Sequence, residues 1–244
     1  MADSQMLRQN VEEIKGDKLF YGGHNVLASP GVHESALKIM KDHVREGARV
    51  LELGAGTGAF TLRLKEQGYQ VTASGIEPHI FTLKEVPFSL FDINGEIPEE
   101  HRGQYEAVAA LEVIEHLENV FDCFRKIYDL LTPNGIALIT TPNISAIRSR
   151  LIFLKSGNFS FFNINLMEQW GHIQILPSWL IIKGAEKAGF NYKISGVGGF
   201  REDLLPWWQN FLTKVMTYIF NILSKERFVG EFSNSTILLL LFKN

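Results

Sequence analysis

The length, composition and charge of the chain exclude several classes of protein. Its 244 residues include 45% hydrophobic side chains, and no charged or proline-rich tract divides them, so one domain with a sizeable core and insertions is expected. The formal net charge of −3 offers no overall basic field to a phosphate backbone, which disfavours a dedicated nucleic-acid-binding protein.

Strand and helix signals alternate along the chain after a polar lead. Residues 29–44 begin with Ser and Pro, as helix N-termini do, and place apolar side chains at helical spacing. Residues 48–53 form a short apolar run closed by Gly54, which is typical of a buried parallel strand. A helix over 59–68 and a strand over 69–77 complete a βαβ unit.

The same alternation continues to the end of the chain. Further strands are predicted over 86–92, 105–111, 135–143, 191–199 and 233–244, with helices over 116–131 and 176–189. Seven strands alternating with helices at this pace predict an α/β fold with a doubly wound parallel sheet.

The segment VLELGAGTG, residues 50–58, follows the first strand of this sheet. Open parallel sheets bind ligands beyond the carboxyl ends of their strands, where the winding reverses. Glycine permits a tight turn there and lets the backbone approach a ligand closely. The segment therefore predicts a ligand site, although a turn that only packs strand on helix is the simpler alternative.

Two ligands compete for this turn. A dinucleotide fits the pattern G-x-G-x-x-G/A through Gly54, Gly56 and Ala59, with a carboxylate about 20 residues further on. However, Gly58 compresses the turn, and Glu52 places a carboxylate where a pyrophosphate would lie. Because like charges repel in a partly dry site, Glu52 favours a cationic ligand such as S-adenosylmethionine.

An ordered set of motifs carries a family resemblance. VLELGAGTGAFTLRL, GIEP, LFDIN, YEAVAALEVIEHLENV and LLTPNGIALITTPN together resemble the class I S-adenosylmethionine-dependent methyltransferases, in the branch similar to ubiquinone-biosynthesis O-methyltransferases. The resemblance covers residues 30–145, with 172–199 and 233–244 in the expected order. It implies a methyltransferase that uses S-adenosyl-L-methionine. It also implies a Rossmann-like, mostly parallel seven-stranded sheet whose last strand is antiparallel.

The resemblance also implies the cofactor contacts. The methionine portion would be cradled by Gly54, Ala55, Gly56 and Gly58, with Glu52 near its amino group, and lined by Leu111 and Glu112. The ribose hydroxyls would bind Glu77 beside Pro78. The adenine amino group would bind Asp92 beside Ile93. The donors of a diol and an amine suit carboxylates, which only accept hydrogen bonds. For Glu77 and Asp92 the alternative is a solvated strand end, and Asp92 also suits a cap of the INGE turn. The helix usual between the second and third strands looks shortened.

The chemistry of transfer needs an acceptor atom held close to the methyl group and a base where a proton must leave. Glu112, Glu115 and His116 fall at i, i+3 and i+4, and His172 follows in a later loop. We take His116 and His172 as the catalytic residues and assign no metal ligand. Two alternatives stay open. The set resembles the metal site of small-RNA 3′-terminal 2′-O-methyltransferases, and Glu115 with His116 also suits a helix start.

The domain organisation predicted is an N-terminal lead and candidate lid over 1–28 and a methyltransferase domain over 29–244. Its insertion at 144–175 is aromatic and mildly basic, which suits an acceptor pocket or a helix with a packed loop. The insertion at 203–228 has a broad apolar helical face. This pattern fits a core-facing helix, a membrane interface or a homodimer contact.

The compartment is predicted from the cysteine content and the N-terminus. Cys123 alone cannot form an internal disulfide or a cysteine-based zinc site. The N-terminus lacks an apolar secretory core, and every 18-residue stretch has polar interruptions. We therefore expect a cytoplasmic protein, peripheral at the membrane if residues 203–228 are interfacial.

The function predicted is S-adenosylmethionine-dependent O-methylation of a small or lipid-linked acceptor, such as a sugar or a quinone precursor. Two hypotheses from other classes are kept. One is a nicotinamide-dependent oxidoreductase, and the other is a catalytically silent adenosyl-binding or scaffold protein.

Overall fold

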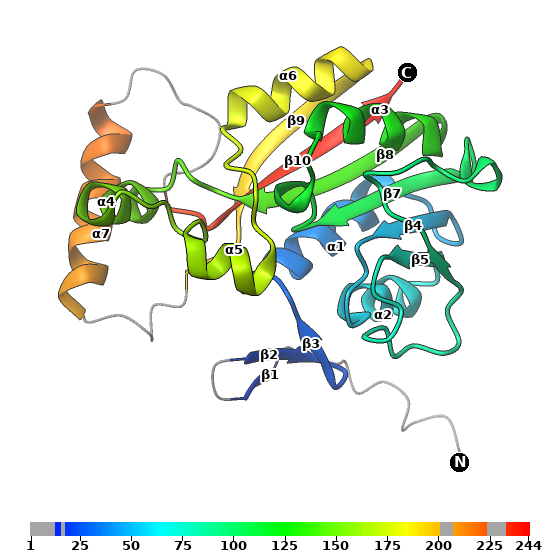
Figure 1. The fold of residues 1–244 in the computed structure, drawn as a ribbon, viewed down its shortest axis with the longest axis horizontal. Coiled ribbons are helices and arrows are strands. Elements are labelled where there is room, and N and C mark those ends of the chain that lie inside the picture. Colours follow the sequence, from blue (N-terminus) through cyan, green and yellow to red (C-terminus); the bar gives the residue numbers. More distant parts are fainter. Residues whose placement is uncertain (1–12, 16–17, 201–206, 224–232) are drawn as a thin grey trace.

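The computed structural model describes residues 13–15, 18–200, 207–223 and 233–244. Within them, a seven-stranded sheet is covered by helices on both faces, and a separate three-stranded sheet lies below it in Figure 1. The strands of the large sheet are β4 Arg49–Leu53, β5 Gln70–Gly75, β6 Phe88–Leu90, β7 Tyr105–Leu111, β8 Leu131–Pro142, β9 Phe190–Val197 and β10 Thr236–Lys243.

The strand order in the large sheet is β6-β5-β4-β7-β8-β10-β9. Neighbours from β6 to β8 pair in parallel, whereas β10 is antiparallel to both β8 and β9. The predicted fold, a mostly parallel seven-stranded sheet with an antiparallel last strand, is confirmed. The chain winds outward from β4 to β6 and then returns to β7 on the other side of β4. The winding therefore reverses between β4 and β7, where such sheets bind ligands.

Helices bury both faces of the sheet. Helices α1 (Val32–His43) and α2 (Ala59–Glu66) pack on one face, and α3 (Val120–Leu130) and α6 (Ser178–Ala188) pack on the other. Along β4, Val50 lies in the α1–α2 core and Leu51 lies in the α3–α6 core. Successive strand side chains point to opposite faces, so an unbroken apolar run is what a strand covered on both faces requires.

The start of one predicted helix differs from the structure. Helix α3 begins at Val120 rather than at residue 116, because the Asn119 side chain caps it by accepting the Asp122 N–H at 3.0 Å. Residues Ile114–His116 form a separate 3-10 turn, η2. The hypothesis that Glu115 and His116 start the following helix is therefore wrong. Residues 76–87, all of them described, contain neither helix nor strand, which agrees with the shortened connection expected there.

The N-terminal lead contains structure that the sequence analysis missed. Strands β1 (Glu13–Lys15), β2 (Lys18–Tyr21) and β3 (His24–Val26) form an antiparallel meander that packs against α2. The turn between β2 and β3 is Gly22–Gly23, where both residues have positive φ. Two glycines between short alternating segments are a hairpin signal, and we treated this stretch only as a polar lead.

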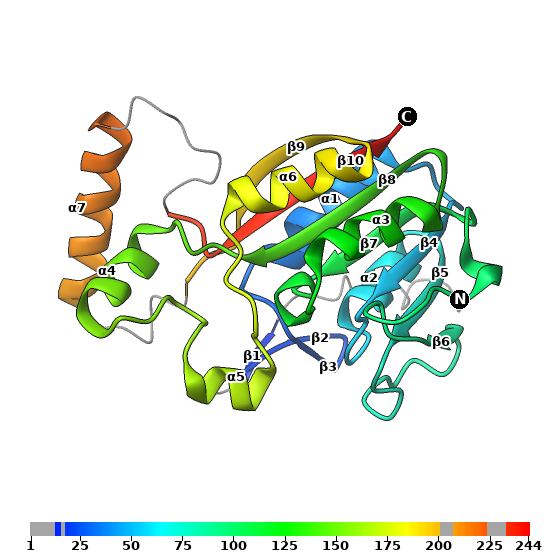
Figure 2. The same ribbon diagram turned by 45° about the horizontal axis from the view of Figure 1, so that its top comes forward.

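The two insertions form helices outside the sheet. The first contains α4 (Ile147–Ser156) and α5 (Ile164–Trp170), and the second contains α7 (Trp207–Leu223). Figures 1 and 2 show α4 and α7 side by side, beyond the end of the sheet. The rest of the predicted range 203–228 lies outside the described residues. Among the helices described, none is both long and apolar enough to cross a bilayer.

The core-facing interpretation of the second insertion is wrong for α7. The Trp207, Phe211 and Tyr218 side chains are 79%, 64% and 69% exposed. The amphipathic pattern was correct, but the apolar side of the helix faces away from the sheet.

Candidate active site

The predicted site residues gather at the carboxyl edge of the parallel strands. Gly54 follows β4, Glu77 lies just beyond β5, and Glu112 follows β7. Because Leu53 at the end of β4 is in register with Ser74 and with Ala110, these three strand ends meet at one edge. A depression lined by Arg49, Gln70, Tyr105 and others lies at the amino ends of the same strands, on the opposite edge.

The glycine turn needs glycine at each of its three positions. Gly54, Gly56 and Gly58 have φ values of 67°, 51° and 91°, a region that side chains disfavour. A Cβ on Gly54 would lie 2.6 Å from Val113 Cγ2, and one on Gly56 would lie 3.0 Å from Leu27 Cδ1. Between them, the Ala55 N–H donates to Ser74 O at 2.9 Å. The turn is therefore fixed to β5, its glycines let Val113 and Leu27 pack close to it, and Gly54 keeps an exposed backbone.

Glu52 lies buried beneath this turn. Its carboxylate accepts a hydrogen bond from the Thr61 hydroxyl of α2, and burial raises its pKa from 4.5 to about 8. The bond from Thr61 opposes this shift without cancelling it. Burial disfavours the charged form, so an isolated Glu52 holds its proton near neutral pH. A cation bound beside it would reverse that preference, as a ligand with an ammonium group does.

The two carboxylates assigned to the adenosine portion are exposed. Glu77 and Pro78 lie on the surface at the tip beyond β5. Asp92 Oδ1 accepts the Asn94 N–H at 2.8 Å, and Asp92 O accepts the Gly95 N–H at 2.9 Å. Asp92 thus makes the turn-capping contact expected of the alternative role, while Ile93 beside it is buried. The roles of Glu77 and Asp92 toward a cofactor stay predictions.

Glu112 has an unusual backbone conformation next to the buried Leu111. Its φ of 54° is in the left-handed region, which non-glycine residues rarely adopt and which concentrates at functional sites. The Glu112 N–H donates to Thr140 O at 3.2 Å, and the Thr140 hydroxyl donates to Glu112 Oε1 at 2.8 Å. Desolvation raises the pKa of its carboxyl to about 7. Thr140 at the end of β8 therefore holds the conformation.

Glu115 is completely buried in the 3-10 turn. Its Oε2 accepts the Thr141 hydroxyl at 2.9 Å, whereas Oε1 has no hydrogen-bond partner among the described residues. Burial first, and then the charge of Glu112, raise the pKa of this carboxyl well above its usual range. The Glu115 carbonyl also accepts the N–H groups of Ile173 and Gln174, both at 3.0 Å. A buried acceptor without a donor is costly, so this oxygen is suited to a proton or a cation.

In both His116 and His172, the Nδ1 atom forms a hydrogen bond with a backbone carbonyl group. His116 Nδ1 lies 3.1 Å from Gly171 O, and His172 Nδ1 lies 2.8 Å from Phe161 O. A carbonyl can only accept, so each Nδ1 carries the hydrogen and each Nε2 keeps a lone pair. Burial is the main cause that lowers the pKa of both rings, which favours the neutral form.

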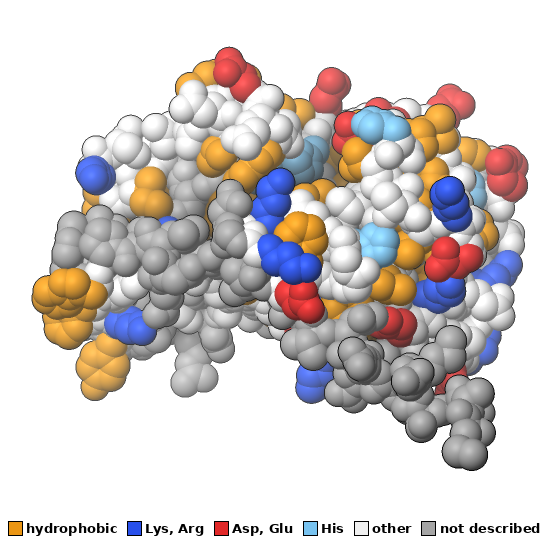
Figure 3. Space-filling view, turned by 90° about the horizontal axis from the view of Figure 1, so that it is seen from below, with side chains coloured by type: hydrophobic (Ala, Val, Ile, Leu, Met, Phe, Trp, Pro, Cys, Tyr) orange, Lys and Arg blue, Asp and Glu red, His pale blue; other side chains and the backbone are white. Residues whose placement is uncertain are grey.

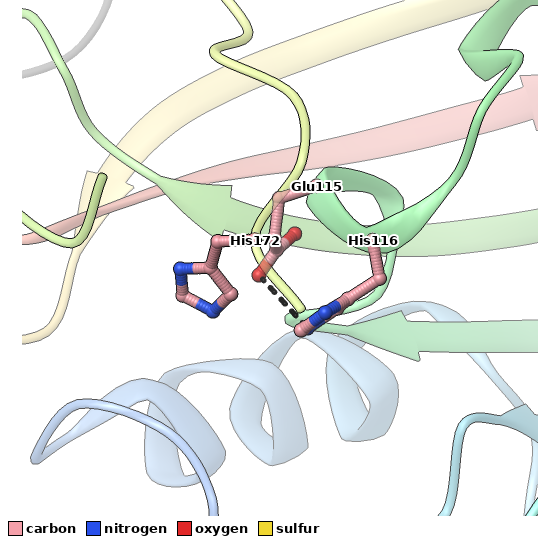
Figure 4. Close-up of side chains that lie close together, drawn as sticks. All are labelled: Glu115, His116 and His172. Atoms are coloured by element: carbon pink, nitrogen blue, oxygen red, sulfur yellow. Dashed lines mark ion pairs between the residues drawn. The ribbon is translucent and has the colours of Figure 1, made fainter. Parts of the chain in front are cut away.

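The three side chains converge on one point, as Figure 4 shows. The His116 and His172 ring centroids lie 4.8 Å apart, edge to face, and His116 Nε2 lies 4.0 Å from Glu115 Oε1. One potential ligand atom from each of Glu115, His116 and His172 lies within 4.8 Å of the others. Two neutral imidazoles and a carboxylate in this arrangement can accept a proton from a hydroxyl, or can bind a divalent cation.

The sequence predicts these side chains but not the way they come together. The i, i+3, i+4 spacing assumed one helical face, whereas Glu112 is left-handed and His116 lies in a 3-10 turn. Thr140 and Thr141, which hold Glu112 and Glu115, were visible in the motif ITTPN and were not assigned a role. The carbonyl groups of Phe161 and Gly171 carry no sequence signal.

The fold and this edge define the class of protein. A doubly wound sheet with a glycine turn after its first parallel strand and carboxylates after the next strands is the arrangement of class I methyltransferases. Residues 30–193 match the family profile described as a methyltransferase domain. The chain therefore belongs to this methyltransferase family.

Curated relatives match part of the chain. The ubiquinone biosynthesis O-methyltransferase of Rickettsia bellii (strain OSU 85-389) is 35% identical over 100 residues, and that of Rickettsia typhi is 35% identical over 101 residues. These matches cover 38% and 39% of this chain and 42% and 41% of the relatives. The chain thus spans about two fifths of the length of the curated relatives it matches.

Solved structures share the fold across most of the chain. Phosphoethanolamine N-methyltransferase 2 of Haemonchus contortus, in complex with S-adenosyl-L-methionine, aligns with a TM-score of 0.57 at 16% identity, over 91% of this chain and 54% of that one. A SAM-dependent methyltransferase of Archaeoglobus fulgidus aligns with a TM-score of 0.57 at 15% identity, over 87% of this chain and 95% of that one. At these identities the likeness shows the fold alone.

Proposed function

We propose that the protein transfers a methyl group from S-adenosyl-L-methionine to an oxygen atom of a small or lipid-linked acceptor. The observation that carries this proposal is the meeting of two sets of side chains at one sheet edge. The glycine turn with Glu52 suits a cationic donor, and the lone pairs of His116 and His172 suit an acceptor hydroxyl. The glycine turn follows β4 and His116 lies just beyond the neighbouring strand β7, whereas His172 reaches His116 from the loop after α5.

The donor side would bind its ligand by charge and by bare backbone. The ammonium and sulfonium of the donor would lie above Gly54, Gly56 and Gly58, where Glu52 becomes ionised beside them. Glu77 beyond β5 would accept hydrogen bonds from the ribose hydroxyls, and Asp92 from the adenine amino group. A phosphate pair would instead leave Glu52 protonated and gain no charge attraction from it, which supports the methyl donor over a nicotinamide cofactor.

The acceptor side would supply a base. As the acceptor oxygen attacks the methyl carbon, the carbon–sulfur bond breaks and the donor leaves as a neutral thioether. The hydroxyl proton passes to Nε2 of His116 or His172, which is free to accept it because Nδ1 holds the hydrogen. Solvent-exposed Met167, Trp170 and Ile173 adjoin His172 along the chain, and these apolar side chains support an acceptor with an apolar portion.

A divalent cation is a second way in which the same residues could act. The orphaned Glu115 Oε1, together with the close ligand atoms of His116 and His172, supports such an ion. Nδ1–H bonds from ligand histidines to carbonyl groups are also typical of metal sites, because they fix the ring orientation. Bound there, the ion would lower the pKa of an acceptor hydroxyl. Turnover of the purified protein with and without a chelator distinguishes this role from that of a metal-free base.

The test of the proposal combines binding with turnover. Calorimetry with S-adenosylmethionine, S-adenosylhomocysteine and NAD should show saturable binding of the two adenosyl compounds and none of NAD. Methyl-labelled donor, incubated with phenolic, sugar and lipid extracts, should then give a labelled ether. Binding of NAD alone would contradict the proposal in favour of an oxidoreductase. Donor binding without any transfer would instead support a silent adenosyl-binding protein.

A further inference from the structure

Helix α7 turns its apolar side to solvent. Trp207, Phe211, Val215 and Tyr218 recur at helical spacing on the outer side, with exposed fractions from 37% to 79%. The opposite side carries Asn210, Thr213 and Thr217, which are less exposed, and the Thr217 hydroxyl oxygen is buried. Helices of globular domains normally bury the apolar stripe and expose the polar one. The reversed orientation of α7 indicates that something outside the described fold covers the stripe.

The first insertion enlarges this surface. Helix α4 packs beside α7 and exposes Phe153 and Leu154, the latter to 81%. We call the α4–α7 face the surface formed by Phe153, Leu154, Trp207, Phe211, Val215 and Tyr218. Hydrophobic and basic side chains meet at the left end of Figure 3, where α4 and α7 lie. Exposed apolar side chains that gather at one end of a molecule mark an interaction site.

The charges beside this face distinguish between its candidate partners. Helix α4 carries Arg148, Arg150 and Lys155, α7 carries Lys214, and neither helix contains Asp or Glu, although the whole chain has a net charge of −3. Lys155 and Lys214 are exposed, and in the sequence they adjoin Leu154 and Val215 of this face. A second copy would place like charges against one another, whereas an anionic lipid surface would attract them.

The aromatic side chains favour the same partner. Trp207 lies in the first turn of α7, and Tyr218 lies on the same side three turns later. Rings of this type combine an apolar body with a polar atom and prefer the boundary between lipid and water. We therefore infer that the α4–α7 face docks on a bilayer that contains anionic lipid. Because α4 follows the carboxyl end of β8, the bilayer would lie on the side of the sheet that carries the candidate active site.

The test is co-sedimentation of the full chain with lipid vesicles. Vesicles of phosphatidylcholine alone are compared with an equal mixture of phosphatidylcholine and phosphatidylglycerol, at low and at high salt. The wild type should sediment with the mixed vesicles, and salt should weaken this binding because the charge attraction is screened. The inference does not depend on the proposed function, since the readout is binding rather than turnover.

Two variants and one control locate the face. The triple variant Trp207→Ser, Phe211→Ser, Tyr218→Ser should lose on the order of a hundredfold in partition coefficient, because it removes most of the apolar area. Lys155→Gln should lose about fivefold on mixed vesicles and nothing on phosphatidylcholine. The control Trp179→Ser removes an aromatic ring of similar exposure, 61%, from α6 and should leave binding unchanged.

Three outcomes would overturn the inference. The wild type could stay in the supernatant with both vesicle types. The triple variant could bind as tightly as the wild type while circular dichroism shows it to be folded. A wild-type dimer that the triple variant dissociates, without vesicle binding by either, would instead assign the face to a second copy.

Discussion

The two sides of the candidate active site are built in different ways. The donor side consists of residues 50–58, whose shape follows from three glycines with positive φ and from the Ala55 bond to Ser74. On the acceptor side, the Gly171 carbonyl holds the His116 ring from 55 residues along the chain, and the Phe161 carbonyl holds the His172 ring. A local motif therefore indicates the donor, whereas only the folded chain assembles the acceptor side. Mutations should separate the two sides into an effect on donor affinity and an effect on turnover.

Loss of a histidine should give the largest effect, and on turnover alone. His172→Ala removes an Nε2 lone pair and should lower kcat by about 10²- to 10⁴-fold, the range for a missing general base. Donor affinity should stay within about twofold, because the glycine turn is untouched. Steady-state kinetics and calorimetry measure the two quantities. His43→Ala, an exposed histidine on α1, is the matched control, and equal losses in both variants would refute the assignment.

Gly54→Ala should affect donor binding instead. The new Cβ would lie 2.6 Å from Val113 Cγ2 at a φ of 67°, which costs about 3 kcal/mol in strain and crowding. Calorimetry should show a loss in donor affinity of about a hundredfold. Gly47→Ala has a similar φ of 73° but open space around its Cβ, so it separates backbone strain from crowding. Unchanged donor affinity in Gly54→Ala would contradict the role of the turn.

The proton on Glu52 should make donor binding depend on pH. Burial raises this pKa from 4.5 to about 8, so the free protein holds the proton at neutral pH, and a bound ammonium would expel it. Donor affinity should therefore rise as pH increases from about 6 to about 8, with proton release seen by calorimetry in buffers of different ionisation enthalpy. Glu52→Gln should abolish the release and lower affinity about tenfold.

The raised pKa of Glu52 has the opposite effect on the stability of the fold, which should fall as pH rises. A raised pKa means that the native state binds the proton more tightly than the unfolded chain does. The contribution of Glu52 to the free energy of unfolding is therefore present below about pH 4.5 and is lost as pH rises toward 8. Glu52→Gln should flatten the decline in Tm across that window. A decline of the same slope in the variant would show that other groups cause it.

The smallest expected effect is a modest loss of turnover from a substitution on the acceptor side. Thr141→Val removes the hydroxyl that donates to Glu115 Oε2 and conserves the shape of the side chain. Turnover should fall about three- to tenfold, because Glu115 is less firmly positioned, while donor affinity stays the same. Thr72→Val, on β5 at a distance from the histidines, controls for the loss of a threonine hydroxyl. A change in donor affinity with unchanged kcat would contradict the separation of the two sides.

The sequence was sufficient for the sheet and for the donor side because both depend on local pattern. The apolar run Val50–Leu53 and the glycines after it encode a strand and a turn, whatever the rest of the chain does. The meander at β1–β3 was missed because its strands are short and its Gly22–Gly23 turn was not weighed. The orientation of α7 could not be predicted, because a helical pattern gives the apolar side but not its partner.

The most direct measurement is a crystal structure with bound S-adenosylhomocysteine. Its amino group should lie above the glycine turn near Glu52, and its ribose hydroxyls should contact Glu77. Its sulfur should point toward the Nε2 atoms of His116 and His172. Ligand density away from the carboxyl end of β4, or a Glu77 carboxylate that faces away from the ribose, would contradict this placement.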